Sequence, residues 1–546
     1  MTAADLLVRN GRVHTVDPVR PQAEAVAVRA GRIMAVGADR ELAELVGPRT
    51  RVIDAAGGTV LPGFVDAHNH VRLGASGQEL ELYRATSLAD IRSRIGAHLR
   101  AHPDLTWVEG VGWNYAAVPG GVPTADQLDG ATGGRPAFLF SYDSHTVWLN
   151  HEAIRRFGIT RDSDRLAWGT VEKHPQTGQP TGWIHDFAVY GISEAGQRAL
   201  AEVVPGYHPQ VQYRSLLTAL AQAAGYGITT LVEPQNGLDD VAMFVRARDE
   251  GKLRSRLVAA MLALPGTDAA RLDVLARLRA EYDDDRLRVG PVKLYIDDVI
   301  EPHTAAMLEP YANHPGRGDT FWPPDEFAAF LVELERRGFQ AFTHATGDRG
   351  IRTVLDAVQH CRAVHGPRDA RHQIVHVECV HPDDLGRFGE LGVVACMQPR
   401  HCAPDIVAQW RANVGPQRER YAWPFASIAA GGGLLAFSSD WNVAEMDPMT
   451  WLYTAVTRAD LSGAGGWNLA ECIDLATAVQ AATLGSAYSI FAERDRGSLS
   501  PGKHADLVVL SRDLFEPGDP LAILDTSVTA TFVAGEQIHG DAACDR

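Results

Sequence analysis

The chain has 546 residues, so its length predicts either several domains or one large barrel with attached segments. Hydrophobic residues make up 45% of the chain and charged residues 22%, which is typical of a globular protein with a large core. The formal net charge of −17 argues against a nucleic-acid partner, because phosphate binding requires a basic surface.

The cysteines and the N-terminal residues favour a cytoplasmic location. The six cysteines are scattered without a C-x-x-C pair, which fits a reduced compartment and no disulfide framework. The opening MTAADLLVRNGRVHTVD lacks the apolar core of a signal peptide. No window approaches the roughly 18 uninterrupted apolar residues of a membrane span, so we expect no membrane partner.

Both ends of the chain have a β-rich pattern. Residues 1–60 contain short β-rich runs broken by Asn-Gly, Ala-Gly and Gly-Gly pairs, which is typical of hairpins. Residues 491–546 repeat this pattern in ADLVVLSRD and VTATFVAGEQI. We expect the two segments to build one small β-domain together.

The middle of the chain, residues 61–490, alternates short apolar runs with helix-like stretches. This alternation predicts βα units around a parallel sheet. Seven runs are strand candidates, and an eighth strand is expected between residues 105 and 145, because an eight-stranded (β/α) barrel is the simplest closure. Residues 105–210 are Gly/Pro-rich and poorly periodic, which indicates an insertion near the barrel mouth. The seven candidates are the run ending in His68 and residues 227–234, 290–298, 339–348, 372–380, 392–399 and 432–440.

Polar residues collect at the carboxyl ends of these strands, where barrel enzymes build their sites. His68 and His70 are two positions apart, so they share one face of a strand. A single strand histidine is more often a hydrogen-bonded core residue than a ligand. Four buried imidazoles without a metal would carry a large desolvation cost, so the set predicts a metal site. Its members are His68, His70, Lys293, His344, His376 and Asp440.

The motifs that carry these residues resemble the amidohydrolase superfamily. GFVDAHNH, the lysine of VKLYID, HATGDR, RHQIVH and SSD follow one another in that order. The resemblance is closest to the amidohydrolase-3 branch, the YtcJ-like and N-substituted formamide deformylase group. SYDSHTVWLNHEAI, PTGWIHDFA, MQPRH and GSLSPGKHADLVVLSRD also fit that branch. The resemblance implies an α/β fold, with a (β/α)8 TIM-like barrel and a small β-sandwich formed by the N- and C-terminal segments.

The resemblance also implies roles for the predicted ligands. His68 and His70 would bind the more buried of two zinc ions, and His344 and His376 would bind the second. Lys293 matches a lysine that is often carboxylated and bridges the two metals. Asp440 matches the acid at the end of strand eight.

Those roles agree with the chemistry of zinc, which accepts imidazole nitrogen and carboxylate oxygen and keeps one position open for water. Water bound there becomes hydroxide near neutral pH and attacks a carbonyl carbon. Asp440 would take the proton and deliver it to the departing amine. His145, in the insertion, is a candidate to stabilise the oxyanion.

Four further residues are candidates for substrate binding. Arg72 and Arg400 stand near strand ends, where each could hold a carboxylate in bidentate fashion or form a structural salt bridge. Trp113 could cover an apolar substituent or belong to the core of the insertion. Asp297, in VKLYIDD, completes the group.

Two acidic residues depart from the pattern of the branch. Asp186 stands where the branch often has Glu, and Glu233 stands where Asp or His is frequent. Glu233 is either a site acid or a solvated carboxylate at a strand end. These departures affect specificity rather than hydrolytic chemistry.

The leading hypothesis is a binuclear zinc hydrolase that cleaves the C–N bond of a small-molecule amide: an N-acyl, N-formyl or peptide-like compound. A deaminase or cyclic-amide hydrolase of the same superfamily is the alternative. Deaminases generally use one metal without a lysine bridge, so the presence of Lys293 argues mildly against that alternative. A non-catalytic scaffold barrel would usually have lost ligands. A phosphoester hydrolase is disfavoured only by the resemblance. A homodimer is compatible with the superfamily.

Overall fold

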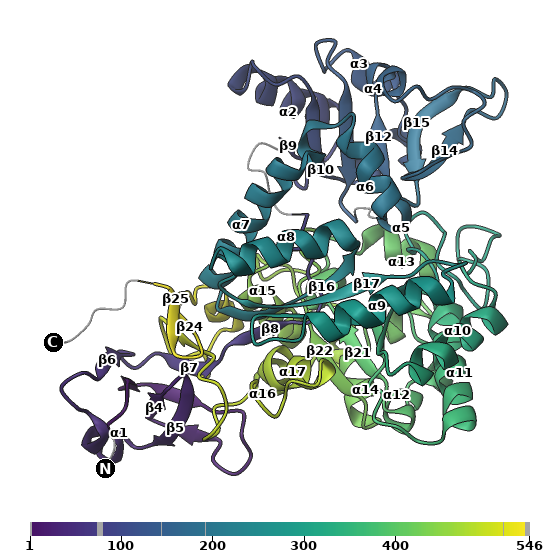
Figure 1. The fold of residues 1–546 in the computed structure, drawn as a ribbon. Coiled ribbons are helices and arrows are strands. Elements are labelled where there is room, and N and C mark those ends of the chain that lie inside the picture. The colour runs from purple at the N-terminus through teal and green to yellow at the C-terminus, as the bar shows by residue number, and fades with distance from the viewer. Residues whose placement is uncertain (1–2, 74–79, 144, 192, 517, 541–546) are drawn as a thin grey trace. The chain divides into compact units, whose positions relative to one another are not determined.

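The computed structural model describes residues 3–73, 80–143, 145–191, 193–516 and 518–540 (Figure 1). The chain divides into two compact units. Unit 1 comprises residues 1–71, 220–234 and 244–546, and unit 2 comprises residues 72–219 and 235–243. Both segments of the predicted β-domain belong to unit 1, together with the barrel strands except for the last two residues of β16. The end of the predicted C-terminal segment, 541–546, lies outside the described residues.

Unit 1 contains a parallel eight-stranded sheet in the order β22-β21-β20-β19-β18-β17-β16-β8. Its first and last strands meet, because the Ala67 amide donates a hydrogen bond to the Phe437 carbonyl at 3.2 Å. The sheet is therefore a nearly closed barrel, which confirms the predicted α/β barrel architecture. The strands are β8 (Phe64–Asp66), β16 (Ile228–Asn236), β17 (Arg256–Leu262), β18 (Leu287–Tyr295), β19 (Ala341–Ala345), β20 (Gln373–His376), β21 (Val394–Met397) and β22 (Leu434–Phe437).

The eighth strand does not lie between residues 105 and 145, where the sequence predicts it. It is β17, whose seven residues are all buried and which pairs in parallel with β18. A short, continuously apolar run lacks the alternation that distinguishes a strand from a buried helix segment, so the pattern of β17 is ambiguous. The strands found between 105 and 145 pair with each other in a separate sheet of unit 2.

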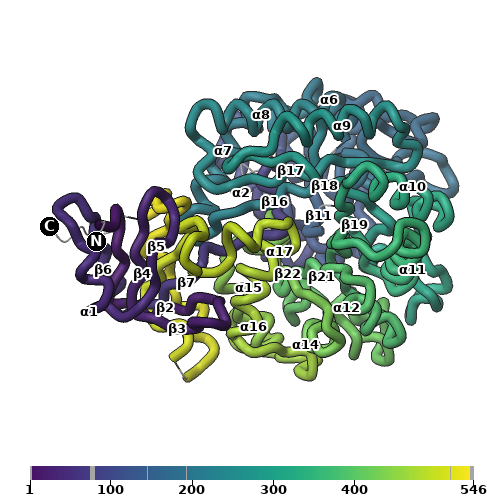
Figure 2. Tube along the Cα trace, turned by 60° about the horizontal axis from the view of Figure 1, so that its bottom comes forward, coloured from purple at the N-terminus to yellow at the C-terminus, as the bar shows by residue number. Residues whose placement is uncertain are grey.

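Helices follow most of the barrel strands, and Figure 2 shows α9, α10, α11, α12 and α14 around the sheet. Helix α10 illustrates why these segments are helical. It has a proline in its first turn, acidic Asp325 and Glu326 near its N-terminus, and Arg336 at its last position, which complements the helix dipole. The main helices are α7 (Pro209–Gly225), α8 (Leu238–Asp249), α9 (Ala269–Glu281), α10 (Pro324–Arg336), α11 (Asp348–His365), α12 (Arg387–Leu391), α13 (Ala408–Val414), α14 (Phe425–Ala430), α15 (Pro448–Thr457), α16 (Leu475–Gln480) and α17 (Ser486–Ser489).

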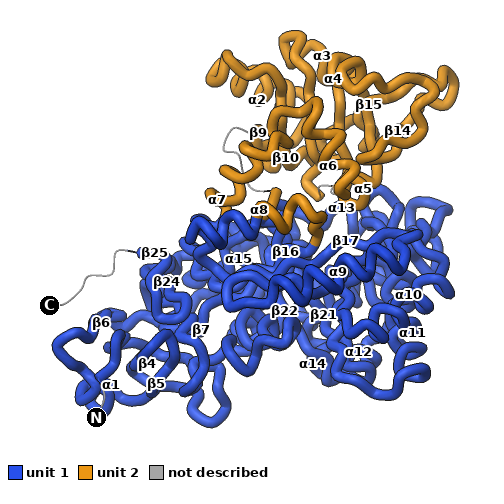
Figure 3. Tube along the Cα trace, in the orientation of Figure 1, with its two compact units in different colours: residues 1–71, 220–234, 244–546 blue, residues 72–219, 235–243 orange. Residues whose placement is uncertain are grey.

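Unit 2 (Figure 3) is built on a seven-stranded sheet whose central strands β11 and β12 are almost completely buried. On β11, Phe138 belongs to one buried cluster and its neighbour Leu139 to another, as expected for alternating side chains. Burial of both faces removes the polar alternation along β11 and β12, which contributes to the poor periodicity of this region. The strands are β9 (Leu80–Glu81), β10 (Val108–Trp113), β11 (Ala137–Ser141), β12 (Val147–Leu149), β13 (Arg165–Leu166), β14 (Gly169–Lys173) and β15 (Pro180–His185), and the helices are α2 (Leu88–Ala101), α3 (Asp126–Asp129), α4 (His151–Arg156), α5 (Phe187–Tyr190) and α6 (Glu194–Ala201).

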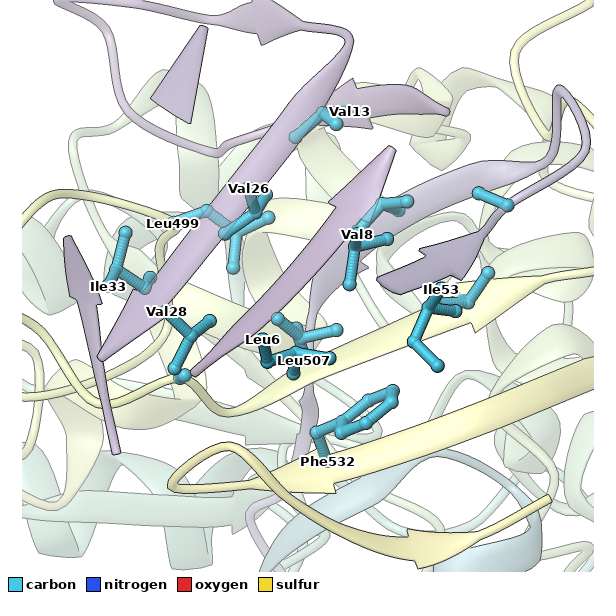
Figure 4. Packing of buried hydrophobic residues seen from close by; sticks show 14 of the residues in the cluster. Leu6, Val8, Val13, Val26, Val28, Ile33, Ile53, Leu499, Leu507 and Phe532 are labelled. Carbon is cyan, nitrogen blue, oxygen red and sulfur yellow. The ribbon is translucent and has the colours of Figure 1, made fainter. Parts of the chain in front are cut away.

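The two ends of the chain meet in one sheet, because β7 pairs with β23 in antiparallel register. A second sheet, of β5, β4, β1 and β6, shares a buried cluster with it (Figure 4). Leu6 and Val8 supply that cluster from one sheet, and Leu507 and Phe532 supply it from the other. A β-sandwich as a domain of its own stays a prediction. The strands are β1 (Leu6–Arg9), β2 (Arg12–His14), β3 (Gln22–Ala23), β4 (Ala25–Arg29), β5 (Arg32–Gly37), β6 (Arg51–Asp54), β7 (Thr59–Pro62), β23 (Leu507–Leu510), β24 (Val528–Val533) and β25 (Glu536–His539), with α1 (Asp39–Leu42) between β5 and β6.

Within the described residues, no helix combines the length and the apolar character needed to cross a membrane.

A buried ion pair joins the barrel to the terminal strands and provides a test of the fold. Arg256, the first residue of β17, donates to both carboxylate oxygens of Asp506 at 2.8 and 3.0 Å, and both residues are buried. Arg256→Met removes the guanidinium group that pairs with this buried carboxylate, so we expect the free energy of unfolding to fall by about 3–5 kcal/mol. Urea unfolding followed by circular dichroism measures it.

The matched control is Arg336→Met, which removes an exposed pair with Glu333 on helix α10. Exposed pairs contribute about 0–1 kcal/mol, so this variant should remain close to wild type. Equal losses in the two variants would contradict the assignment of the Arg256 pair as a buried structural link.

Candidate metal centre

The carboxyl end of the barrel brings the six predicted ligands into one buried region of unit 1. His68 and His70 follow β8, Lys293 lies in β18, His344 in β19 and His376 in β20, and Asp440 follows β22. The ring centroids of His68 lie 5.2 Å from His70 and 5.3 Å from His376, and those of His344 and His376 are 4.5 Å apart. One ligand atom from each of His68, His376 and Asp440 lies within 4.8 Å of the other two.

Asp440 lies between two groups of histidines. Its Oδ1 atom is 3.1 Å from His70 Nε2 and 3.4 Å from His68 Nε2. Its Oδ2 atom is 3.6 Å from His401 Nε2 and 3.8 Å from His376 Nδ1. Asp440 and His376 both have positive φ, at 54° and 80°, a conformation that non-glycine residues seldom adopt and that is concentrated at functional sites.

Hydrogen bonds to surrounding oxygen atoms determine which ring nitrogens can act as ligands. His376 Nδ1 lies 3.0 Å from Oε1 of Gln398, whose amide nitrogen donates to Ser438 Oγ at 2.9 Å. His344 Nε2 lies 3.1 Å from the Asp298 carbonyl. A nitrogen that donates to a carbonyl carries the proton, so Nε2 of His376 and Nδ1 of His344 are the lone-pair nitrogens.

Several buried polar atoms at this end form no hydrogen bond with the described residues. They are both ring nitrogens of His68, Nδ1 of His70, Nζ of Lys293 and Oδ1 of Asp440. Leaving a buried polar group unsatisfied costs about 1–3 kcal/mol. Imidazole nitrogens and carboxylate oxygens are the donors that zinc accepts, so these residues fit a divalent cation.

Burial sets the protonation states that ligation requires. It lowers the pKa of His68 and of His376 well below the usual range, and the neighbouring positive charges of Lys293 and other histidines add to the effect. Both rings are therefore neutral, the form that binds a metal. Burial lowers the pKa of Lys293 to about 8, although Asp440 and Glu233 oppose the shift.

Glu233 is a buried acid on β16, so it is not a solvated carboxylate at a strand end. Its Oε1 atom lies 3.9 Å from His70 Nδ1.

Asp66, which the sequence pattern did not indicate as a site residue, positions the two loops that carry His68, His70 and Asp440. Its carboxylate accepts hydrogen bonds from the Ser439 hydroxyl at 2.6 Å, the Ser439 amide at 2.9 Å and the Asn69 side chain at 2.8 Å. Burial raises the pKa of Asp66 to about 7, against the opposing effect of these donors. Its position in GFVDAHNH, at the end of the strand that precedes the histidines, was the available signal.

Arg400 and Asp297, two residues of unit 1 that are predicted to bind substrate, both contact other groups of the protein. Arg400 is buried and pairs with Glu445 at 2.8 Å and with Asp405 at 3.3 Å. Asp297 accepts hydrogen bonds from the backbone amides of residues 306, 346 and 347 at 3.0–3.1 Å. These contacts account for the burial of both charged groups, and their roles in substrate binding stay predictions.

The other sequence candidates belong to unit 2. Arg72 is buried and lies 3.5 Å from Asp240, and the Trp113 indole donates to the Leu139 carbonyl at 3.0 Å. The His145 amide donates to Asp143 Oδ1 at 3.0 Å. Asp186, with φ of 60°, accepts a hydrogen bond from the Thr170 hydroxyl at 2.6 Å. The catalytic role of His145 and the substrate-binding roles of Arg72 and Trp113 stay predictions.

Several known proteins are similar to the chain over most of its length. Protein LONG AFTER FAR-RED 3 of Arabidopsis thaliana is 29% identical over 98% of this chain and 92% of its own. Putative amidohydrolase YtcJ of Bacillus subtilis (strain 168) is 27% identical over 90% and 91%, and N-substituted formamide deformylase of Arthrobacter pascens is 25% identical over 93% and 94%.

Among solved structures, an uncharacterized metal-dependent hydrolase from Pyrococcus horikoshii OT3 has the same fold, with a TM-score of 0.72 at 22% identity over 94% of this chain and 98% of that one. The sequence model of the amidohydrolase family matches residues 51–539. The chain therefore belongs to the amidohydrolase family of hydrolases, as its motifs predict.

Proposed function

We propose that the protein is a metal-dependent hydrolase that cleaves the C–N bond of a small-molecule amide, with two Zn²⁺ ions at the centre described above. The observation that carries the proposal is the approach of ligand atoms of His68, His376 and Asp440 to within 4.8 Å at the carboxyl end of the barrel. Membership of the amidohydrolase family supports this assignment. The similarity to an N-substituted formamide deformylase favours N-formyl and N-acyl substrates.

The ligands divide into two groups. His68 Nε2, His70 Nε2 and Asp440 Oδ1 would hold the first ion, and His344 Nδ1 and His376 Nε2 would hold the second. When bound, zinc supplies Lewis acidity, which lowers the pKa of water and polarises a carbonyl group.

Lys293 would bridge the two ions as a carbamate. Only the neutral amine reacts with CO2, and burial favours that form because it lowers the pKa of Lys293 to about 8. The amine nitrogen forms a bond to the CO2 carbon and releases a proton, which leaves two oxygens that share one negative charge. The negative charges of Asp440 and Glu233 disfavour another anion nearby, so carbamate formation and metal binding should depend on each other.

Asp440 would move the proton of the reaction. The Asp440 amide donates to the His68 carbonyl at 2.9 Å, which anchors its backbone to the loop that carries the first ligands. Its carboxylate accepts a proton from the attacking water and delivers it to the amine nitrogen as the C–N bond breaks.

The reaction itself is tested with a panel of N-formyl amines, N-acetyl amines and dipeptides, in which release of the amine is measured. We expect turnover of at least one amide class, loss of activity after chelation and its return with Zn²⁺. A parallel panel of phosphotriesters and aminopurines is the comparison. Turnover of that panel alone would contradict amide hydrolysis.

The carbamate bridge is tested with Lys293→Ala. We expect the metal content to fall from about two equivalents per chain to about one, because a two-metal site loses its bridge. Activity should fall by more than about 100-fold, the upper end of the loss that is typical when a group that only contacts a metal ligand is replaced. Inductively coupled plasma mass spectrometry measures the metal, and the exposed Lys252→Ala is the control. Full metal content and activity in Lys293→Ala would contradict the bridge.

The proton-transfer role of Asp440 is tested by comparing Asp440→Asn with His68→Ala. An asparagine side chain at this position retains an oxygen ligand but cannot accept the proton. Asp440→Asn should therefore lose turnover by about 100-fold or more while keeping most of its metal. His68→Ala should lose both. Equal metal loss in the two variants would identify Asp440 mainly as a ligand.

A further inference from the structure

A second group of potential ligands adjoins the six predicted ones. His376, Glu378 and His401 each have a ligand atom within 4.8 Å of the other two. Glu378 lies two residues beyond the end of β20, and His401 lies in the 3₁₀ turn η6 (Pro399–Cys402) that follows β21. Both positions therefore belong to the end of the barrel where the other ligands lie.

His401 faces the side of Asp440 that the His68 and His70 pair does not use. His401 Nε2 is 3.6 Å from Asp440 Oδ2, whereas His68 and His70 approach Oδ1. The His401 ring is nearly parallel to the His376 ring, with an interplanar angle of 5° and centroids 6.0 Å apart. Histidine rings thus lie on both sides of the Asp440 carboxylate.

Glu378 is a buried carboxylate in an acidic environment. It is 7% exposed, and its Oε2 atom accepts a hydrogen bond from the Trp410 indole at 2.9 Å. Its electrostatic neighbours include Glu301, Asp297 and Asp440. Several carboxylates buried close together repel one another, and a divalent cation offsets that repulsion.

We propose that His401 and Glu378 are additional ligands of the second cation, the one bound by His376, on the Oδ2 side of Asp440. This inference rests on the proposed function and extends its metal centre. Together with His344 and His376, these residues would give the second cation three imidazoles and one carboxylate, donors that suit zinc and other divalent transition metals.

The test uses Co²⁺ as a spectroscopic probe. The metal-depleted wild type is titrated with Co²⁺, followed by its visible absorption, and the metal content after desalting is measured by mass spectrometry. We expect His401→Gln and Glu378→Gln each to weaken binding of the second equivalent by about 10-fold or more and to change its absorption bands. The first equivalent should bind as in wild type.

Matched controls separate ligand loss from general damage. Glu335→Gln removes a carboxylate that is also 7% exposed but that pairs with His372 near the opposite end of the strands. His365→Gln replaces a half-buried histidine of helix α11 whose Nε2 lies near the Val332 carbonyl. Both should bind Co²⁺ as wild type does. Glu378→Gln retains an oxygen that can accept from Trp410, and near-ultraviolet circular dichroism checks the fold of every variant.

The outcomes distinguish this inference from the proposed function. If wild type binds two equivalents and the variants at 401 and 378 do so equally tightly with unchanged spectra, the two residues are not ligands, although the metal centre stands. If wild type binds fewer than two equivalents, both the inference and the two-ion proposal are wrong.

Discussion

The contact between the first and last strands of the barrel is the constraint on which the metal centre depends. His68 and His70 follow β8, and Asp440 follows β22, about 370 residues later in the chain. Backbone hydrogen bonds from Asp440 to His68 and from His70 to Trp441 hold the two segments together, at 2.9 and 2.7 Å. Asp66 reinforces the contact by accepting from the hydroxyl and the amide of Ser439. The ligand set is complete only when the barrel is closed at this seam.

Burial determines the protonation states of the candidate ligands. The same desolvation that keeps the imidazoles of His68 and His376 neutral also favours a neutral Lys293 amine. The acids Asp440, Glu233 and Glu378 are buried in the same region, so the site combines neutral nitrogen donors with carboxylate oxygens. Such a combination is costly without a cation and favourable with one. Metal binding at the carboxyl end of the barrel would therefore contribute both to the proposed function and to stability.

The gathering of the candidate ligands at one end of the barrel could be predicted from sequence, because each of them has a local signature. His68 and His70 share a strand face, and Lys293, His344 and His376 interrupt apolar strand runs. Strand β17 could not be placed in the same way, because a continuously apolar run fits a strand and a helix segment equally well.

The side-chain partners that the fold brings together could not be predicted from the sequence either. Arg400 pairs with Glu445, and Arg72 pairs with Asp240, through tertiary contacts. The local sequence around each arginine therefore fitted a substrate-binding role and a structural ion pair equally well. Glu378 and His401 have no characteristic spacing relative to the predicted ligands, and their proximity to His376 is apparent only in three dimensions.

The central claim is that divalent cations occupy the carboxyl end of the barrel, and anomalous X-ray diffraction at the zinc absorption edge tests it most directly. Crystals of protein purified without chelators and supplied with Zn²⁺ should give two anomalous peaks, one beside His68 and His70 and one beside His376, on the two sides of Asp440. A well-ordered barrel without a peak at these residues, or with zinc only at the exposed Asp126, Asp129 and His151 group, would contradict the account.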